Sequence, residues 1–201
     1  LTIRAAVLSC VPFVAYLTLV GTSGSTSWLY LCLFMVIAYS AKGLRFKEKP
    51  FLDSITSSLH FVGPMIFGLA LAEVNFAQSQ IIIAILAFVL WGVASHAFGA
   101  VQDVRADREA KIASIATALG ARLTTRIAFG FYVIAGLLTL TLPDRFAFAA
   151  LAALPYLFVV GREFNITDEN CEQANRGWKV FIWLNFFAGA VICSLLIGPS
   201  A

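Results

Sequence analysis

Blocks of apolar residues fill most of this sequence and constrain its fold more than any other feature. An α-helix needs about 20 residues to cross a hydrocarbon core about 30 Å thick. Sixty per cent of the 201 residues are hydrophobic and 12% are charged, against about 25% charged in soluble domains. The sequence therefore predicts an all-α integral membrane protein, a multi-pass helical bundle. We expect seven transmembrane helices, running approximately over Ala5 to Val20, Trp28 to Ala41, Leu52 to Ala72, Ile81 to Ala100, Leu123 to Leu142, Phe146 to Gly161 and Val180 to Ile197.

The second and sixth blocks are short for a full span. We expect these two helices to tilt less than the others, or to extend into their flanking polar residues. There is no linker and no internal repeat, so residues 1–201 are predicted to form one transmembrane domain. The chain opens on Leu1 without a recognisable secretion signal, and we expect its amino terminus to be incomplete.

The basic residues support this topology. If Arg4 faces the cytoplasm, alternation of the seven blocks leaves only Arg145, of the 14 Lys and Arg residues, on the outer side. Cytoplasmic loops of membrane proteins carry such an excess of Lys and Arg. The net charge of +3 therefore needs no nucleic-acid partner. The basic residues predicted to share the cytoplasmic side are Arg4, Lys42, Arg45, Lys47, Lys49, Arg105, Arg108, Lys111, Arg122, Arg126, Arg162, Arg176 and Lys179.

The predicted outer loops are short and nearly neutral, whereas three longer cytoplasmic loops, over residues 42–51, 101–122 and 162–179, hold most of the charge. A functional site is therefore expected to open to the cytoplasm. The four cysteines, Cys10, Cys32, Cys171 and Cys193, form no C-x-x-C pair. We expect them to be reduced packing residues.

Asp103 and Asp107 lie where the fourth apolar block ends. They are four residues apart, so on a helix they share one face. Two neighbouring carboxylates repel each other, but they suit Mg²⁺, which binds one or two carboxylates together with phosphate oxygens. The alternative is a solvated helix at the membrane surface, and D-x-x-x-D alone does not decide between the two. The nearby basic residues that could help neutralise a diphosphate are Arg105, Arg108 and Lys111.

The first cytoplasmic loop is the second candidate site. Its basic residues Lys42, Arg45 and Lys47 could bind a diphosphate, with Tyr39 donating a hydrogen bond. The alternative is membrane-anchoring charge that reaches to lipid head groups. Asp53 follows Pro50 closely, a position that suits an acidic residue at the start of a helix.

Three segments together resemble the UbiA prenyltransferase superfamily. They are residues 39–53, with the pattern Y-S-x-x-x-L-R-F-K-x-K-P-x-L-D, residues 57–64, reading S-S-L-H-F-V-G-P, and residues 102–120, reading Q-D-x-x-x-D-R-E-A-K-I-A-S-I-A-T-x-L-G. Within the superfamily the residues of these segments are most similar to those of lycopene elongases, which attach a five-carbon prenyl unit to a carotenoid. The resemblance covers Tyr39 to Gly120 well and the remaining residues only as apolar helices.

The resemblance implies a bundle of nine transmembrane helices in which two aspartate-rich motifs hold Mg²⁺ and a prenyl diphosphate. Asp103 and Asp107 match the second motif and would be the catalytic metal ligands. The first motif, N-D-x-x-D-x-x-x-D, is not in this sequence. The seven blocks would therefore be helices three to nine, and the first motif would precede Leu1 or come from a partner subunit. The 201 residues alone are expected to be inactive.

The implied reaction is transfer of a prenyl group from an allylic diphosphate to a lipophilic acceptor, here a carotenoid such as lycopene. The diphosphate would be bound by Tyr39, Lys42, Arg45, Lys47, Arg108 and Lys111. Related enzymes use quinone or chlorophyll precursors, so these acceptors stay open. A non-catalytic or accessory membrane subunit is the alternative from another class. A transporter is disfavoured because the charges crowd one surface, and a CDP-alcohol phosphotransferase because its D-G-x-x-A-R pattern is missing.

Two departures from the family pattern remain. Relatives often carry two prolines where this chain has Lys42 and Gly43, which puts the geometry of that loop in doubt. Asp168 and Glu172 are another pair of acids four residues apart, but they lie in a loop where the family has no metal motif. We expect them to be solvated loop charge.

His60 and His96 lie within apolar blocks, and Asn185 lies in the middle of one. A polar group in the membrane costs free energy unless it is paired, so each is expected to form an interhelical hydrogen bond or to face a cavity. His96 is seven residues before Asp103, on nearly the same helical face and about two turns deeper. The structural role is favoured for all three residues, and His96 and Asn185 are the candidates to line the cavity.

Overall fold

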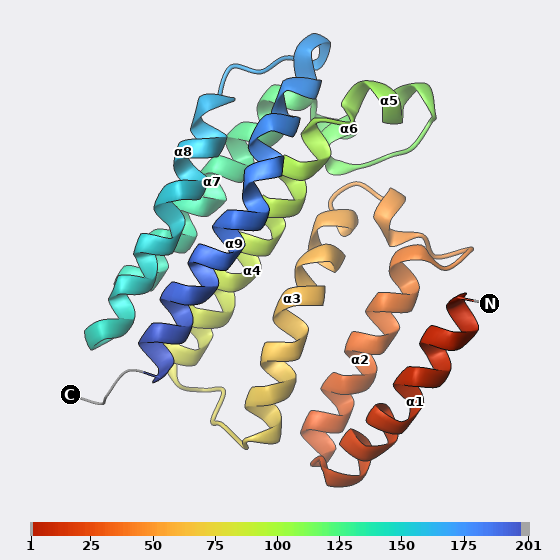
Figure 1. Cartoon of the computed structure of the whole chain (residues 1–201), viewed down its shortest axis with the longest axis vertical. Coiled ribbons are helices and arrows are strands. Elements are labelled where there is room, and N and C mark those ends of the chain that lie inside the picture. The colour runs from red at the N-terminus through yellow and green to blue at the C-terminus, as the bar shows by residue number, and fades with distance from the viewer. Residues whose placement is uncertain (1, 198–201) are drawn as a thin grey trace.

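The computed structural model describes residues 2–197, and in this part of the chain all regular structure is helical. The elements, coloured along the chain in Figure 1, are α1 (Thr2–Val20), α2 (Ser23–Ser40), η1 (Phe46–Glu48), α3 (Leu52–Leu71), α4 (Ser79–Val101), α5 (Val104–Glu109), α6 (Ile115–Leu119), α7 (Ala121–Leu140), η2 (Asp144–Ala152), α8 (Ala153–Arg162), η3 (Asp168–Gln173) and α9 (Ala174–Ile197). The prediction of an all-helical fold is confirmed.

Five segments are long and apolar enough to cross a membrane: Leu52–Leu71, Ser79–Val101, Ala121–Leu140, Asp144–Arg162 and Asp168–Ile197. The first predicted block forms a shorter apolar helix, Arg4–Val20. The second block forms α2, which begins at Ser23, before the predicted start of the block. Thr22 caps this end of the helix, because its side chain accepts a hydrogen bond from the Ser25 backbone nitrogen at 3.2 Å. The Ser, Gly and Thr residues of this first turn make α2 less apolar. Seven spans therefore stays a prediction.

The sixth block is built differently from the single α-helix that we expected. The candidate span that contains this block, Asp144–Arg162, begins with the nine residues of the 3₁₀-helix η2 and ends with the ten residues of α8. A 3₁₀-helix rises about 2.0 Å per residue and an α-helix about 1.5 Å. The 19-residue segment is therefore about 33 Å long, enough to cross a hydrocarbon core of about 30 Å.

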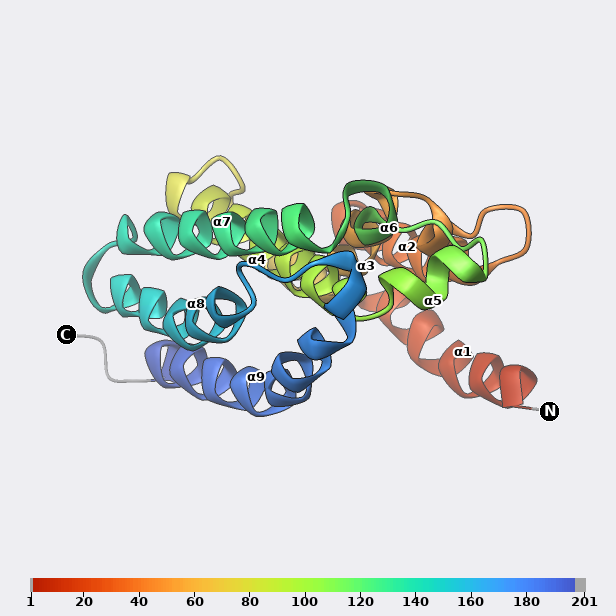
Figure 2. The ribbon, with the colours of Figure 1, turned by 90° about the horizontal axis from the view of Figure 1, so that it is seen from above.

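The helices run alternately up and down, so that the three long charged connections, over residues 42–51, 101–122 and 162–179, meet at one end of the molecule (Figure 1). That end carries η1, the α5–α6 segment and η3, and the view from above shows them over the ends of α3, α4 and α7 (Figure 2). The fold thus agrees with the prediction that the basic loops lie on one side of the molecule. The opposite end carries the short turns between α1 and α2 and between α3 and α4.

Small residues let the central helices α3 and α4 approach closely. A Cβ atom built on Gly92 would lie 2.9 Å from the Cβ of Ser58 and 3.0 Å from its Cα. Ser58 in turn donates a hydrogen bond to the carbonyl oxygen of Val89 at 2.9 Å. Close approach through small residues and interhelical hydrogen bonds is how membrane helices associate, because lipid offers no hydrophobic driving force between them.

Aromatic side chains fill the core between α4, α7, α8 and α9. Tyr132 and Tyr156 stack with their ring centroids 5.1 Å apart, and Phe98 stacks on Phe181 at 5.4 Å. Both tyrosines also satisfy their hydroxyl groups: Tyr132 pairs with Ser95 at 2.7 Å and Tyr156 donates to Asn185 at 2.6 Å. Asn185 therefore forms an interhelical hydrogen bond, one of the two roles expected for it. This core fixes α4, whose end carries Asp103.

Candidate active site

A cavity of about 290 Å³ opens at the charged end, where α4 ends and α5 begins. Its walls combine the end of α4, the start of α5, the first cytoplasmic loop and the beginning of α9. The cavity brings together four residues expected at the site, Lys47, His96, Asp103 and Asp107. The full lining is Lys47, His96, Gly99, Ala100, Gln102, Asp103, Asp107, Ser114 and Trp178.

Asp103 and Asp107 lie one helical turn apart, as their spacing requires. Asp103 precedes the first residue of α5, and its carbonyl oxygen accepts a hydrogen bond from the Asp107 backbone nitrogen at 2.8 Å. Burial raises the pKa of the Asp103 carboxyl. Burial, and then the neighbouring Asp103 charge, raises the pKa of Asp107. Burial thus disfavours the charged form of both carboxyls, and a cation bound between them would favour it.

His96 is held from two sides in the cavity wall. Its Nδ1 atom lies 3.0 Å from Ser54 Oγ on α3, and its Nε2 atom lies 3.4 Å from the hydroxyl of Tyr39 on α2. Tyr39 also packs edge-on against His60, with ring centroids 5.2 Å apart. These contacts join three helices behind the cavity. They place Tyr39 beside the cavity through His96 and give His60 a packing role.

Asp53 lies at the start of α3, as predicted, but its side chain contacts another helix. Its side chain is fully buried, and Oδ2 accepts a hydrogen bond from the Ile115 backbone nitrogen at 2.8 Å. Ile115 opens α6 directly after Ser114, a cavity residue. Asp53 thus anchors the α5–α6 segment, whose residue Ser114 lines one side of the cavity.

The remaining basic residues of the first loop and of α5 lie around the cavity rather than in its lining. Lys42, Arg45 and Lys111 are exposed. Arg45 forms an ion pair with Glu48 in the same loop. Gly43 has a φ of +95°, so this departure from the usual prolines gives the loop a left-handed residue that proline cannot supply.

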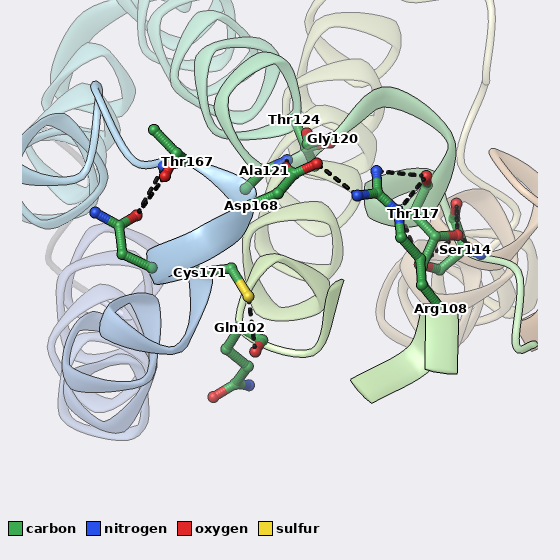
Figure 3. Close-up of polar contacts among 11 residues, drawn as sticks. Gln102, Arg108, Ser114, Thr117, Gly120, Ala121, Thr124, Thr167, Asp168 and Cys171 are labelled. Atoms are coloured by element: carbon green, nitrogen blue, oxygen red, sulfur yellow. Dashed lines mark hydrogen bonds and ion pairs between the residues drawn. The ribbon is translucent and has the colours of Figure 1, made fainter. Parts of the chain in front are cut away.

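Arg108 is turned toward η3 (Figure 3). Its Nη1 atom lies 2.5 Å from Asp168 Oδ2, and its Nη2 atom donates to the carbonyl oxygen of Thr117 at 3.1 Å. The prediction that Asp168 is solvated loop charge is therefore wrong. Asp168 is paired because α5 folds back against η3, an approach that only the tertiary structure creates. Glu172 is exposed but also paired, with Arg105 at 3.1 Å.

The cavity fits Mg²⁺ only in part. Asp103 and Asp107 supply the one or two carboxylates that Mg²⁺ takes beside phosphate oxygens and water. Among residues 2–197, however, no group of three or more His, Cys, Asp or Glu side chains could hold a metal ion. Asp103 and Asp107 are therefore the predicted metal ligands among the residues that line this cavity.

Several lining residues escaped the sequence reasoning. Trp178 comes from α9 and packs over Gly99, where an added Cβ would lie 2.9 Å from the indole ring. Gln102 pairs with Asn175 of α9, also across the chain. Ser114 had a local signal, since it forms a capping box with Thr117 at the start of α6. The α9 contacts had none, because they depend on how α9 packs against α4.

Comparison with known proteins agrees with this site. The UbiA prenyltransferase family model matches residues 2–194. A lycopene elongase/hydratase of Corynebacterium glutamicum is 49% identical over 193 residues, which cover 96% of this chain and 67% of the relative. The C(50) beta-cyclic carotenoids biosynthesis protein LbtBC of Dietzia sp. is 48% identical over 197 residues, 98% of this chain and 45% of the relative.

More distant similarity extends to archaea. A lycopene elongase/hydratase of Haloferax volcanii is 34% identical over 128 residues, 64% of this chain and 41% of the relative. No solved structure matches the chain. The resemblance to lycopene elongases that the three segments predicted is confirmed, and the protein belongs to the UbiA prenyltransferase family.

Proposed function

We propose that this chain is part of an enzyme that transfers a prenyl group from a short allylic diphosphate to a carotenoid such as lycopene. The observation that carries the proposal is the convergence of Asp103, Asp107, Lys47 and His96 on one cavity in a UbiA chain. The names of the relatives, lycopene elongase/hydratase and carotenoid biosynthesis protein, support the choice of acceptor. A quinone or chlorophyll precursor is the alternative acceptor.

In this proposal Asp103 and Asp107 hold Mg²⁺ against the diphosphate. When bound, Mg²⁺ would neutralise the diphosphate and so favour ionisation of the allylic C–O bond. Lys47, which lines the cavity, would receive the leaving diphosphate. Tyr39, Lys42, Arg45, Lys111 and Arg108 remain predicted diphosphate contacts. Of these, Arg108 is already engaged by Asp168, and the next subsection gives that pair another role.

The proposal also requires the first aspartate-rich motif, which is not in this sequence. A diphosphate carries two to three negative charges at neutral pH. Two carboxylates hold one Mg²⁺ ion between them, and a single divalent cation does not neutralise that much charge. The first motif would come from another segment of the same polypeptide or from a partner subunit. The 201 residues alone should then show no prenyl transfer, and robust Mg²⁺-dependent activity from them would contradict this requirement.

The test of the function is Mg²⁺-dependent release of diphosphate by the complete protein. Asp103→Asn and Asp107→Asn should each lower the rate by a factor of at least about 100 while leaving the thermal melting profile unchanged, since each removes a metal ligand. Glu109→Gln, an exposed acid on the same short helix, is the matched control and should retain activity. Wild-type rates in both aspartate variants would favour an accessory, non-catalytic subunit.

The acceptor is tested separately. Expression of the complete gene in a lycopene-producing host should yield longer carotenoids. Unchanged lycopene together with a prenylated quinone would reassign the acceptor.

We further propose that the charged end faces the cytoplasm, on the strength of the positive-inside bias. Ser23 and Glu109 are exposed at opposite ends of the molecule. Single cysteines at these positions, in a background without the native cysteines, should react with a membrane-impermeant reagent from opposite sides. Labelling of both from the same side would exclude this topology.

A further inference from the structure

Asp168 uses its two carboxylate oxygens on two different elements (Figure 3). Oδ2 accepts from Arg108 of α5 at 2.5 Å, and Oδ1 accepts from the Ala121 backbone nitrogen, in the first turn of α7, at 2.6 Å. Residues far apart in the chain are thereby joined at the charged end. Burial raises the pKa of this carboxyl, but the hydrogen bonds from Ala121 and Arg108 outweigh burial and leave the pKa below its ordinary value.

The helix that Asp168 holds is weakly anchored by its own residues. α5 has six residues, and Val104 is the one that is buried. So short a helix is unstable in isolation, because few backbone hydrogen bonds offset the cost of ordering it. Its other attachments are Arg105 to Glu172, an ion pair exposed on both sides, and Arg108 to Asp168 and Thr117. Exposed ion pairs contribute little. The Arg108–Asp168 pair is the less exposed of the two, with side chains 45% and 34% exposed against 54% and 57%, and Arg108 adds the bond to Thr117, so the Arg108 contacts are the stronger restraint.

The backbone around Gly120 allows this contact. Gly120 has a φ of +80°, which favours glycine, and a Cβ built on it would lie 3.2 Å from Asp168 Oδ1. A side chain at this position would be strained and would press on the carboxylate. The turn between α6 and α7 thus admits Asp168 to the start of α7.

Asp107 precedes Arg108 in the chain, so the two side chains leave the same helix in different directions. Asp107 lines the cavity, while Arg108 points to η3. We infer that Asp168 is a positioning residue for prenyl transfer. By holding Arg108 it fixes the orientation of α5, and this orientation keeps the Asp107 carboxylate facing the metal and the diphosphate. The inference rests on the proposed function.

This role and direct diphosphate binding by Arg108 predict opposite changes in the KM for the allylic diphosphate when Asp168 loses its charge. If Arg108 bound the diphosphate, loss of the competing Asp168 charge would free the guanidinium and lower the KM for the allylic diphosphate. If Asp168 positions α5, the same loss would loosen the metal-bearing helix. The Mg²⁺ concentration at half-maximal rate and the KM would then both rise.

The experiment compares Asp168→Asn with Glu169→Gln in the complete protein. Asparagine can still accept the Ala121 hydrogen bond but loses the ion pair with Arg108, so the two roles of Asp168 are separated. Glu169 is an exposed neighbour in the same loop, and its variant removes an equal charge. Two quantities are measured: the Mg²⁺ dependence of diphosphate release, and hydrogen–deuterium exchange of the backbone amides of residues 104–109, which needs no substrate or metal.

In Asp168→Asn we expect the Mg²⁺ concentration at half-maximal rate to rise roughly 10- to 100-fold, the range found when residues that orient metal ligands are removed. We also expect the α5 amides to exchange faster, and Glu169→Gln to match wild type in both measurements. Arg108→Gln should reproduce the Asp168→Asn effects, and the double variant should lose no more than either single variant, since the two residues act as one unit.

Unchanged exchange together with unchanged Mg²⁺ dependence in Asp168→Asn would overturn the inference, as would a lowered KM. An Asp168→Asn protein that failed to fold would leave Arg108→Gln to decide by the same two measurements. A wild-type protein without Mg²⁺-dependent diphosphate release would refute the proposed function instead. The exchange measurement would still report whether Asp168 restrains α5.

Discussion

The carboxylate of Asp53 and the backbone nitrogen of Ile115 form a hydrogen bond of 2.8 Å. Asp53 lies in the first turn of α3, Ile115 is the first residue of the short helix α6, and the carboxylate is fully buried between them. The first N–H groups of a helix have no partner within the helix. Asp53 therefore supplies the acceptor that the first N–H group of α6 lacks, and the cavity wall at Ser114 depends on a residue from α3.

Asp53→Ala should destabilise the protein by about 1–3 kcal/mol, because the buried Ile115 N–H group would lose its acceptor. Asp53→Asn retains an acceptor oxygen of the same reach and should lose less. The measurement is thermal unfolding in detergent, read by circular dichroism. Equal stability of wild type and Asp53→Ala would show that this hydrogen bond does not hold α6.

Ser54→Ala tests the orientation of His96. The substitution removes the Ser54 Oγ contact to Nδ1 at 3.0 Å and leaves the longer Tyr39 contact to hold the ring. Loss of such a hydrogen bond typically costs about 1 kcal/mol. We expect a loss of kcat/KM of up to about tenfold with intact folding. Ser57→Ala, on the same helix, is the control, and an equal loss there would point to a general weakening of α3.

Gly92→Ala should separate α3 from α4. The added Cβ would approach the Ser58 backbone to 3.0 Å, and overpacking of this kind costs about 1–3 kcal/mol. Gly130→Ala on α7 is the matched control, since no atom lies within 4 Å of its built Cβ. That variant should be neutral or slightly stabilised, because alanine favours a helix by up to about 1 kcal/mol over glycine. The comparison uses melting temperatures of the purified proteins.

The stabilising effect of Asp168 should depend on pH. Its folded-state pKa is lowered, with burial opposing and the hydrogen bonds from Ala121 and Arg108 prevailing. A lowered folded pKa gives stability that is fully present above the unfolded carboxyl pKa of about 3.9 and is lost as the pH falls through the folded value. The melting temperature of wild type should therefore exceed that of Asp168→Asn near neutral pH.

On acidification toward about pH 3 the difference between the two proteins should shrink, because the wild-type carboxyl becomes protonated. Melting curves at several pH values in one detergent measure this directly. A difference that stayed constant down to this pH would mean that the charge of Asp168 contributes nothing to stability.

The sequence alone determined the membrane-embedded helical fold, the clustering of the charged loops at one end and the family. These follow from local properties: the length of an apolar run, the sign of charge between runs, and a four-residue spacing that places Asp103 and Asp107 on one helical face. His96 belongs to the same group, because its distance from Asp103 along α4 placed it near the cavity before any packing was known.

Tertiary structure decided the partners. Asp53 suited the start of a helix, yet its carboxylate binds Ile115, 62 residues away. Asp168 carried no sign of a role, yet it contacts Arg108 across 60 residues and Ala121 across 47. Such contacts depend on how each helix is rotated about its axis and where neighbouring helices end relative to one another. Hydropathy and charge patterns leave both open, because they fix which residues enter the membrane but not which helix each of them faces.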